Sequence, residues 1–147
     1  MTTIDTANTP AAEEHYDLII IGTGSGNSIP SPDFDDQKIA IIEKGTFGGT
    51  CLNVGCIPTK MYVYPAEISE SSRELDRLGV SVSIQDVRWR EIRDRIFGRI
   101  DPISEAGAAY RRDGEGTTLH QGRGRFVGPR GVAETAAVGS TTRVTAD

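Results

Sequence analysis

Both cysteines of the chain lie in one short glycine-rich segment. Cys51 and Cys56 are separated by four residues, with Gly48, Gly49 and Gly55 around them. A disulfide between them would close a very small ring and contribute only about 2 kcal/mol to stability. A structural disulfide of a secreted domain usually comes with several more cysteines, and a zinc site needs about four ligands. The pattern therefore favours a redox-active disulfide, with a structural bridge, a zinc site or two unrelated buried thiols as alternatives.

The residues around the two cysteines indicate how the segment is built. The glycines suit a backbone that passes close to a flat ligand, and Pro58 is tolerated only near the start of a helix. We therefore expect a helix to begin at Cys56 and to run to Leu78, with a bend at Pro65. A cysteine in a first helical turn is favoured as the thiolate.

A second glycine-rich segment precedes the cysteines. The apolar run 16–21 is rich in β-branched residues and predicts a buried parallel strand. It leads into the glycine turn 22–27, and a second apolar strand follows at 38–43. Glu43 ends that strand about twenty residues after the glycines, as the dinucleotide-binding fingerprint requires. Ordinary packing of two strands around a helix is the alternative.

Each position of this fingerprint has an expected task. Gly22 permits the tight turn, and Gly24 lets the backbone approach a pyrophosphate at a helix N-terminus. Glu43 is expected to accept hydrogen bonds from the adenosine ribose. The sixth position, usually Gly or Ala, is Asn27.

Two prolines interrupt the expected crossover helix. Pro30 and Pro32 fall where the helix should run, and an interior proline costs about 3 kcal/mol. We therefore expect this helix to be short, kinked or partly irregular before Asp33.

The two segments together predict the cofactor. A dithiol accepts two electrons and a nicotinamide delivers a hydride, so a flavin is the natural relay between them. Cys51 lies eight residues after Glu43, so the chain runs from the ribose end of the dinucleotide toward its other end. The predicted dinucleotide is FAD, with the disulfide against the flavin ring.

Three segments, 22–27, 39–43 and 46–60, resemble the amino-terminal part of the pyridine nucleotide–disulfide oxidoreductases. Within that family, further segments are similar to the branch that reduces mycothiol disulfide, and Asn27 fits that branch. These are residues 22–28, 45–47, 59–64, 87–89 and 97–103. The cysteine motif itself is nearly the same in lipoamide dehydrogenases.

The resemblance implies a mechanism and a set of site residues. NADPH or NADH would reduce FAD, and the flavin would reduce the Cys51–Cys56 disulfide. Cys56 would contact the flavin, while Cys51 would attack the disulfide of a small-molecule substrate. Lys60 would stabilise negative charge near the flavin N5, or else extend along the helix surface. The implied cofactor contacts are Gly22, Thr23, Gly24, Gly26, Glu43, Lys44, Gly49, Thr50, Cys51, Lys60 and Gly124.

The resemblance also implies an assembly. Family members form homodimers and carry an NAD(P)H domain, a dimerisation domain and a second FAD-binding segment, none of which this chain resembles. We therefore expect a fragment of the enzyme, inactive by itself. Lipoamide dehydrogenase or glutathione reductase-like activity, and an inactive remnant, are the alternatives.

The expected fold is α/β, an incomplete Rossmann-like FAD-binding domain over 16–147 with a parallel sheet, a crossover helix and a β-meander. A disordered tail is expected over residues 1–15. After the long helix we expect a short alternating segment at 80–84 and a second helix capped by Asp86. The meander should begin at Thr117, with strands at 119–121, 124–127, 132–134 and 141–144.

Composition restricts the partners. The 147 residues carry a net charge of −5, and their basic residues form no continuous stripe, which argues against nucleic acid. No apolar run approaches the ~20 residues needed to cross a bilayer. Residues 1–14 lack the apolar core of a signal peptide. These features, with only two cysteines, predict a protein of the reducing cytoplasm that binds no metal.

Overall fold

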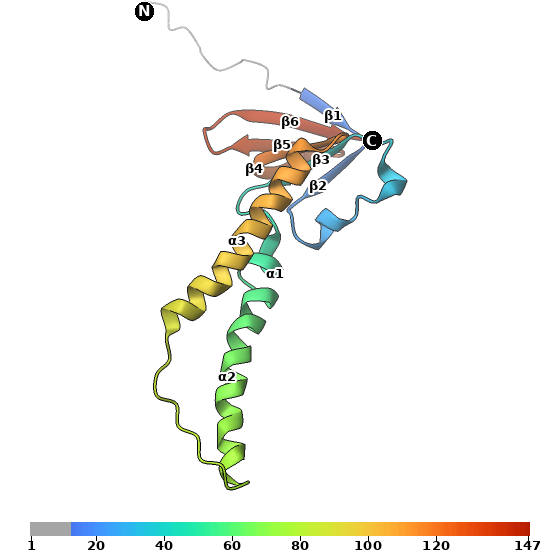
Figure 1. Ribbon diagram of the computed structural model, residues 1–147. Coiled ribbons are helices and arrows are strands. Elements are labelled where there is room, and N and C mark those ends of the chain that lie inside the picture. Colours follow the sequence, from blue (N-terminus) through green and yellow to red (C-terminus); the bar gives the residue numbers. More distant parts are fainter. Residues whose placement is uncertain (1–12) are drawn as a thin grey trace, which may run out of the picture. The chain divides into compact units, whose positions relative to one another are not determined.

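The computed structural model describes residues 13–147 as an α/β protein (Figure 1), which confirms the predicted fold class. Its contacts divide the chain into two compact units. The first comprises the described residues up to Gly45 together with Tyr110–Asp147, and the second is Thr46–Ala109. The strands are β1 (Glu13–Tyr16), β2 (Leu18–Ile21), β3 (Ile39–Glu43), β4 (Thr117–Gly128), β5 (Gly131–Ala136) and β6 (Thr141–Ala146). The helices are α1 (Gly49–Asn53), α2 (Cys56–Asp76) and α3 (Trp89–Asp113), with short 3-10 turns η1 (Ser25–Ser28) and η2 (Pro32–Phe34).

The first unit is built on a six-stranded mixed sheet of order β1-β6-β5-β4-β3-β2. β2, β3 and the first part of β4 run parallel, with Ile39 paired to both Leu18 and Thr117. From Gly122 onward β4 pairs with β5 in the antiparallel sense, and β5 pairs with β6. The predicted meander is therefore present, but its first two predicted strands are a single strand that changes partner between Gln121 and Gly122.

β3 forms the centre of the core. Ile39, Ala40, Ile41 and Ile42 are each at most 3 % exposed. Ala40 belongs to a buried cluster with Tyr16 and Val144, while Ile39 and Ile41 pack with Ile20. Burial on both faces explains why the sequence of this strand is a continuous apolar run rather than an alternating one.

Two predictions for the first unit need correction. The connection between β2 and β3 contains η1 and η2 in place of a crossover helix, because two prolines so close together, at positions 30 and 32, remove helical hydrogen bonds and disfavour a helix there. Residues 13–15, predicted to belong to a disordered tail, form part of β1, which pairs in parallel with β6. The rest of that predicted tail, residues 1–12, lies outside the described residues.

The second unit contains α1, α2 and most of α3 (Figure 1). α2 begins at Cys56 as predicted and continues through Pro65. The short alternating segment predicted at 80–84 forms no regular structure, since alternation alone provides no partner strand. α3 starts at Trp89, so Asp86 lies before the helix and does not cap it. Within residues 13–147, no helix combines the length and apolar character that crossing a membrane requires.

Candidate active site: a dithiol loop and a nucleotide-binding loop

The structure brings the two cysteines together in what we call the dithiol loop, residues 46–60. Cys51 lies in α1, and Cys56 is the first residue of α2. Both are exposed free thiols, and their side chains hydrogen-bond to each other. The sulfur of Cys51 also interacts with the backbone N–H groups of Cys56 and Ile57, in the first turn of α2. A thiol pair in contact, accessible to solvent, has the arrangement that reversible oxidation needs.

Three glycines make this arrangement possible. Gly48 and Gly49 have φ angles of +108° and +66°, a left-handed conformation that L side chains rarely adopt. A Cβ on Gly55 would lie 2.8 Å from the Thr50 carbonyl oxygen and 3.3 Å from Cys51 Cα. Gly55 thus lets the start of α2 approach α1 closely, which brings Cys51 next to Cys56.

The contact between the thiols changes their chemistry. The hydrogen bond with Cys56 is the main cause that raises the pKa of the Cys51 thiol, followed by slight burial and the charge of Cys56. The N–H groups of Cys56 and Ile57 act in the opposite direction but do not compensate. In the reduced pair Cys51 therefore keeps its proton to a higher pH than an isolated cysteine.

The dithiol loop is anchored by residues that the sequence did not single out. The Asn53 side-chain amide donates to the carbonyl oxygens of Phe47 (2.9 Å) and Gly49 (3.1 Å). The Ser104 hydroxyl of α3 donates to the Phe47 carbonyl at 2.5 Å. Phe47 is buried, and its ring lies 2.7 Å from where a Cβ on Gly107 would be. Small residues three apart on α3, Ser104 and Gly107, were the available signal for this packing.

Other predicted contacts of the dithiol loop are on its surface. Lys60 is exposed and follows Cys56 by four residues in α2, so the two share a helix face. Thr50 in α1 is also exposed. Their predicted contacts with the cofactor stay predictions.

Residues 22–27, which the sequence predicts to bind the nucleotide and which we call the nucleotide-binding loop for that reason, follow β2 in the first unit. Gly22 has a φ of +93°, and its N–H donates to the Ile42 carbonyl oxygen at 2.7 Å. A Cβ on Gly24 would meet no atom within 4 Å, whereas one on Gly26 would make an ordinary 3.6 Å contact with Ile20. We expected this loop to lead into the N-terminus of a helix. That expectation is wrong, because η1 is a 3-10 turn of four residues. The open backbone at Gly24 is therefore what this loop offers a ligand.

The acid at the end of β3 is tied to this loop. Glu43 Oε2 accepts hydrogen bonds from the Thr23 N–H (2.8 Å) and the Thr23 hydroxyl (2.7 Å). Its Oε1 accepts from the Gly45 N–H at 2.8 Å. Partial burial raises the pKa of the Glu43 carboxyl, but the bonds from Thr23, Gly45 and Lys44 together outweigh burial, so the pKa is lowered. Glu43 is thus a fixed carboxylate at neutral pH.

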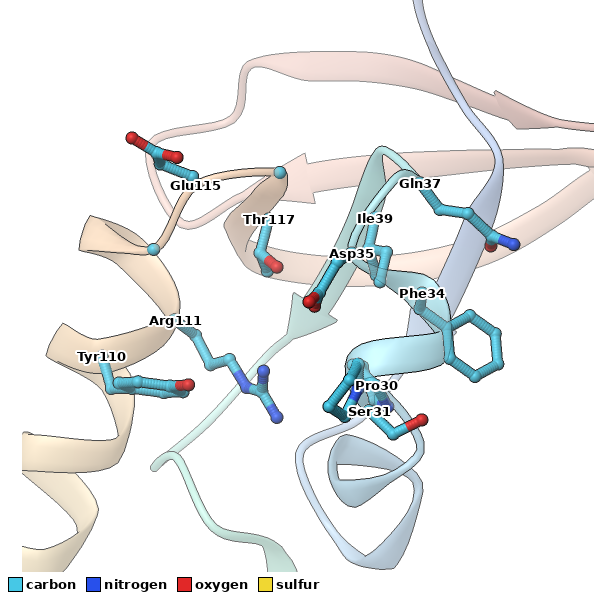
Figure 2. Close-up of a pocket in the computed structure, with 13 residues that line it drawn as sticks. Pro30, Ser31, Phe34, Asp35, Gln37, Ile39, Tyr110, Arg111, Glu115 and Thr117 are labelled. Carbon is cyan, nitrogen blue, oxygen red and sulfur yellow. The ribbon is translucent and has the colours of Figure 1, made fainter.

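Asn27, the departure from the fingerprint, has a local explanation. Arg111 donates from Nε to the Asn27 side-chain oxygen at 3.0 Å and from Nη2 to its backbone oxygen at 2.6 Å. Figure 2 shows the Arg111 guanidinium directed toward Pro30 and Ser31, in a cavity of about 510 Å³. The amide side chain at position 27 therefore adds a second hydrogen bond between η1 and the end of α3, whereas Gly or Ala would keep only the bond to the backbone oxygen.

Lys44 and Gly124, which are also predicted to contact the cofactor, lie in different surroundings. Lys44 is exposed, and its backbone N–H belongs to the set that bonds Glu43. A Cβ on Gly124 would lie 3.2 Å from Ile42 and 3.5 Å from Val132. The glycine at 124 is thus explained by close strand packing, and its predicted contact with the cofactor stays a prediction.

These residues fit the ADP part of FAD, with one condition. The open backbone at Gly24 suits a pyrophosphate, and Glu43 at the end of β3 suits a ribose hydroxyl. A carboxylate has about four acceptor positions, and Thr23, Gly45 and Lys44 already donate to Glu43. A ribose hydroxyl would have to replace one of these donors.

Comparison with known proteins gives a consistent result. The chain is 52% identical over 113 residues to a mycothione reductase of Mycobacterium tuberculosis, which covers 77% of this chain and 25% of that protein. It is 31% identical over 116 residues to a dihydrolipoyl dehydrogenase of Bacillus subtilis, covering 78% and 24% of the two chains. It is 30% identical over 149 residues to a thioredoxin reductase of Emiliania huxleyi, covering 92% and 30%. No family model matches the chain.

The α/β fold, the dithiol loop and these relatives agree on one family of proteins. The chain belongs to the pyridine nucleotide–disulfide oxidoreductases, as its sequence predicted. It spans about a quarter of the length of the curated relatives it matches first.

Proposed function

We propose that this chain supplies the disulfide-reducing centre and the ADP-binding loop of an enzyme that reduces a low-molecular-weight thiol disulfide with NAD(P)H. The observation that carries the proposal is the hydrogen-bonded pair Cys51–Cys56 at the first turn of α2. FAD, when bound, would pass two electrons from the nicotinamide to the Cys51–Cys56 disulfide. Gly22, Gly24 and Glu43 are the proposed residues for its ADP part, and Lys60 is proposed to stabilise negative charge beside the flavin.

The chain's own chemistry then follows in two exchanges. The Cys51 thiolate attacks one sulfur of the substrate disulfide, forming a mixed disulfide and releasing one thiol, which takes up the proton that Cys51 lost. The Cys56 thiolate next attacks Cys51 Sγ, which restores the Cys51–Cys56 disulfide and releases the second thiol. One dithiol is oxidised and one substrate disulfide is reduced to two thiols.

We propose mycothiol disulfide as the substrate, because the 52% identity to a mycothione reductase exceeds the 31% identity to a dihydrolipoyl dehydrogenase. A cytoplasmic homodimer is proposed for the working enzyme, by the same resemblance. The relatives are about three times as long as this chain, so we propose that these 147 residues do not by themselves catalyse turnover with NAD(P)H.

A half-reaction tests the thiol chemistry without flavin or nicotinamide. The reduced chain is mixed with mycothiol disulfide, and released thiol is measured together with protein mass. We expect two thiols per chain from the unmodified protein. Cys56→Ser should release one thiol and retain a mixed disulfide on Cys51, while Cys51→Ser should react slowly.

The controls define what would contradict the proposal. Glutathione disulfide and lipoamide serve as alternative substrates, and faster release from either would assign a different substrate. A mixed disulfide that forms faster on Cys56 of the Cys51→Ser variant than on Cys51 of the Cys56→Ser variant would reverse the two roles.

A further inference from the structure

The carbonyl oxygen of Phe47 is held from two directions. Ser104 Oγ donates to it from α3 at 2.5 Å, and Asn53 Nδ2 donates to it from the end of α1 at 2.9 Å. Ser104 is only 4% exposed. A backbone carbonyl oxygen has two lone pairs, so these two donors use both. The peptide group that joins residues 47 and 48 therefore has a fixed orientation.

The side chain of Phe47 is held by the same helix. Phe47 is buried, and a Cβ on Gly107 would lie 2.7 Å from its ring. Ser104 and Gly107 are three positions apart in α3, so they share a face of the helix. α3 therefore holds Phe47 both by its main chain and by its side chain.

The residues that follow Phe47 lead directly to the first thiol. Gly48 and Gly49 have positive φ angles, and glycine has a wider range of backbone conformations than any other residue. Their conformation is therefore set by what holds the peptide groups on either side. Cys51 comes two residues after Gly49, in α1. The orientation of the Phe47 carbonyl thus decides where α1 begins and how Cys51 lies relative to Cys56.

We propose that Ser104 is a positioning residue for the dithiol, which acts through the Phe47 carbonyl to keep Cys51 within reach of Cys56. This inference rests on the thiol chemistry proposed above. A disulfide needs a narrow geometry, with its Cβ atoms about 3.8 Å apart, whereas the reduced thiols tolerate many arrangements. Without the Ser104 hydrogen bond the reduced loop would sample more conformations, and disulfide formation would have to remove them. Loss of the Ser104 hydroxyl should therefore disfavour the disulfide.

The equilibrium between dithiol and disulfide measures this effect. The full chain is equilibrated with glutathione and glutathione disulfide, so that the two cysteines lose two electrons and glutathione disulfide is reduced to two thiols. Ser104→Ala should lower the equilibrium constant about threefold, as part of the contribution of one hydrogen bond. Ser104→Thr keeps the hydroxyl and should stay within about 1.5-fold of the unmodified chain. Asn53→Ala removes the other donor to the same oxygen and should lower the constant about fivefold.

The reaction of the reduced chain with mycothiol disulfide separates the two exchanges. Attack of Cys51 on the substrate joins two molecules, so it does not require Cys56 to be close. Attack of Cys56 on the Cys51 mixed disulfide takes place within the loop, and its rate follows the effective concentration of the two groups. Ser104→Ala should therefore release the first thiol no more slowly than the unmodified chain, and the second about threefold more slowly.

Two control variants separate positioning from a general loss of stability. Ser72→Ala removes a hydroxyl that donates to a backbone carbonyl within α2, and Ala108→Gly weakens α3 one turn beyond Ser104. Both changes keep the two donors to the Phe47 carbonyl, so neither should alter the disulfide equilibrium. A change that only destabilises the fold affects the dithiol and disulfide forms equally and leaves that equilibrium where it was. Circular dichroism checks that each variant keeps its helices.

The outcomes distinguish this inference from the proposed function. An equilibrium constant for Ser104→Ala equal to that of the unmodified chain, or a loss no larger than that of Ala108→Gly, would show that Ser104 has a structural role only. A slower first release with an unaltered second release would also overturn the inference. An unmodified chain that forms no Cys51–Cys56 disulfide with glutathione disulfide, and releases no thiol from mycothiol disulfide, would contradict the proposed function itself and this inference with it.

Discussion

The two glycine-rich loops use their glycines in opposite ways. In the dithiol loop, a Cβ on Gly48 would lie 2.4 Å from Leu52, and one on Gly55 would lie 2.8 Å from the Thr50 carbonyl oxygen. In the nucleotide-binding loop, a Cβ on Gly24 would meet nothing within 4 Å. The dithiol loop therefore needs its glycines for its own packing, whereas the nucleotide-binding loop leaves space that the protein does not fill.

This difference indicates how each loop would function. The dithiol loop positions its reacting atoms by itself, since both thiols and the N–H groups near them belong to residues 51–57. The proposed nucleotide-binding loop presents an open backbone and a fixed carboxylate, and is completed only by a ligand. Substitution of the tightly packed Gly55 in the first loop should thus affect folding and thiol chemistry together, and substitution of Gly24 in the second should affect binding alone.

The largest effect is expected for Gly55→Ala. The new methyl group would overlap the Thr50 carbonyl, and such overpacking costs about 1–3 kcal/mol of the free energy of unfolding. Because the same contact brings Cys51 to Cys56, the equilibrium constant for their disulfide against glutathione should fall about tenfold. Denaturant unfolding and redox titration measure the two quantities.

Gly98→Ala is the matched control for this change. Gly98 lies in α3, where a Cβ would meet nothing within 4 Å. The substitution should stabilise the chain by up to about 1 kcal/mol, because alanine favours helix, and it should not alter the disulfide equilibrium. Equal effects of Gly55→Ala and Gly98→Ala would show that the dithiol loop does not depend on the close approach at Gly55.

Gly24→Ala should separate stability from binding. With open space around the new methyl group, the free energy of unfolding should change by less than about 0.5 kcal/mol. The methyl group would occupy the space proposed for the pyrophosphate, so binding of ADP should weaken at least about tenfold. NMR titration of the chain with ADP measures binding. Unaltered ADP affinity, or an unmodified chain that binds no ADP at millimolar concentration, would contradict the proposed role.

A smaller and more local effect is expected for Cys56→Ala. The hydrogen bond with Cys56 is the main cause that raises the pKa of Cys51, while the N–H groups of residues 56 and 57 lower it. Removal of the Cys56 side chain keeps those N–H groups, so the pKa of Cys51 should fall. The rate of Cys51 alkylation by iodoacetamide should then reach half its maximum at a lower pH than in Cys51 of the unmodified reduced chain. A shift to higher pH would show that the thiol contact is not the main cause.

Much of this molecule could be predicted from residue patterns that report a strong local preference. The continuous apolar run of β3 requires burial on both faces, and the cysteine spacing with its glycines identifies the dithiol loop. The contacts of Asn27 with Arg111 and of Ser104 with Phe47 were not predicted, since each joins residues more than fifty positions apart. β1 was missed because Glu13 and Glu14 are poor strand formers, and pairing with β6 overrides that preference.

The smallest effect is expected for Thr23→Val, which tests the link between the nucleotide-binding loop and Glu43. Valine keeps the shape of threonine but removes the hydroxyl that donates to Glu43 Oε2. One hydrogen bond to a partly exposed carboxylate contributes about 1 kcal/mol, so the variant should be less stable by about that amount at pH 7.

The pH dependence of this loss distinguishes the hydrogen bond from a packing defect. The pKa of Glu43 is lower in the folded chain than its ordinary value, so its carboxylate stabilises the fold fully above the unfolded pKa, about 4.3. That contribution is lost as the pH falls through the folded pKa. The unmodified chain and Thr23→Val should therefore differ most at neutral pH and converge below pH ~4. Urea unfolding from pH 7 to pH 3 measures the difference. A gap that stays constant over this range would assign the loss to packing and leave Glu43 without its bond to the Thr23 hydroxyl.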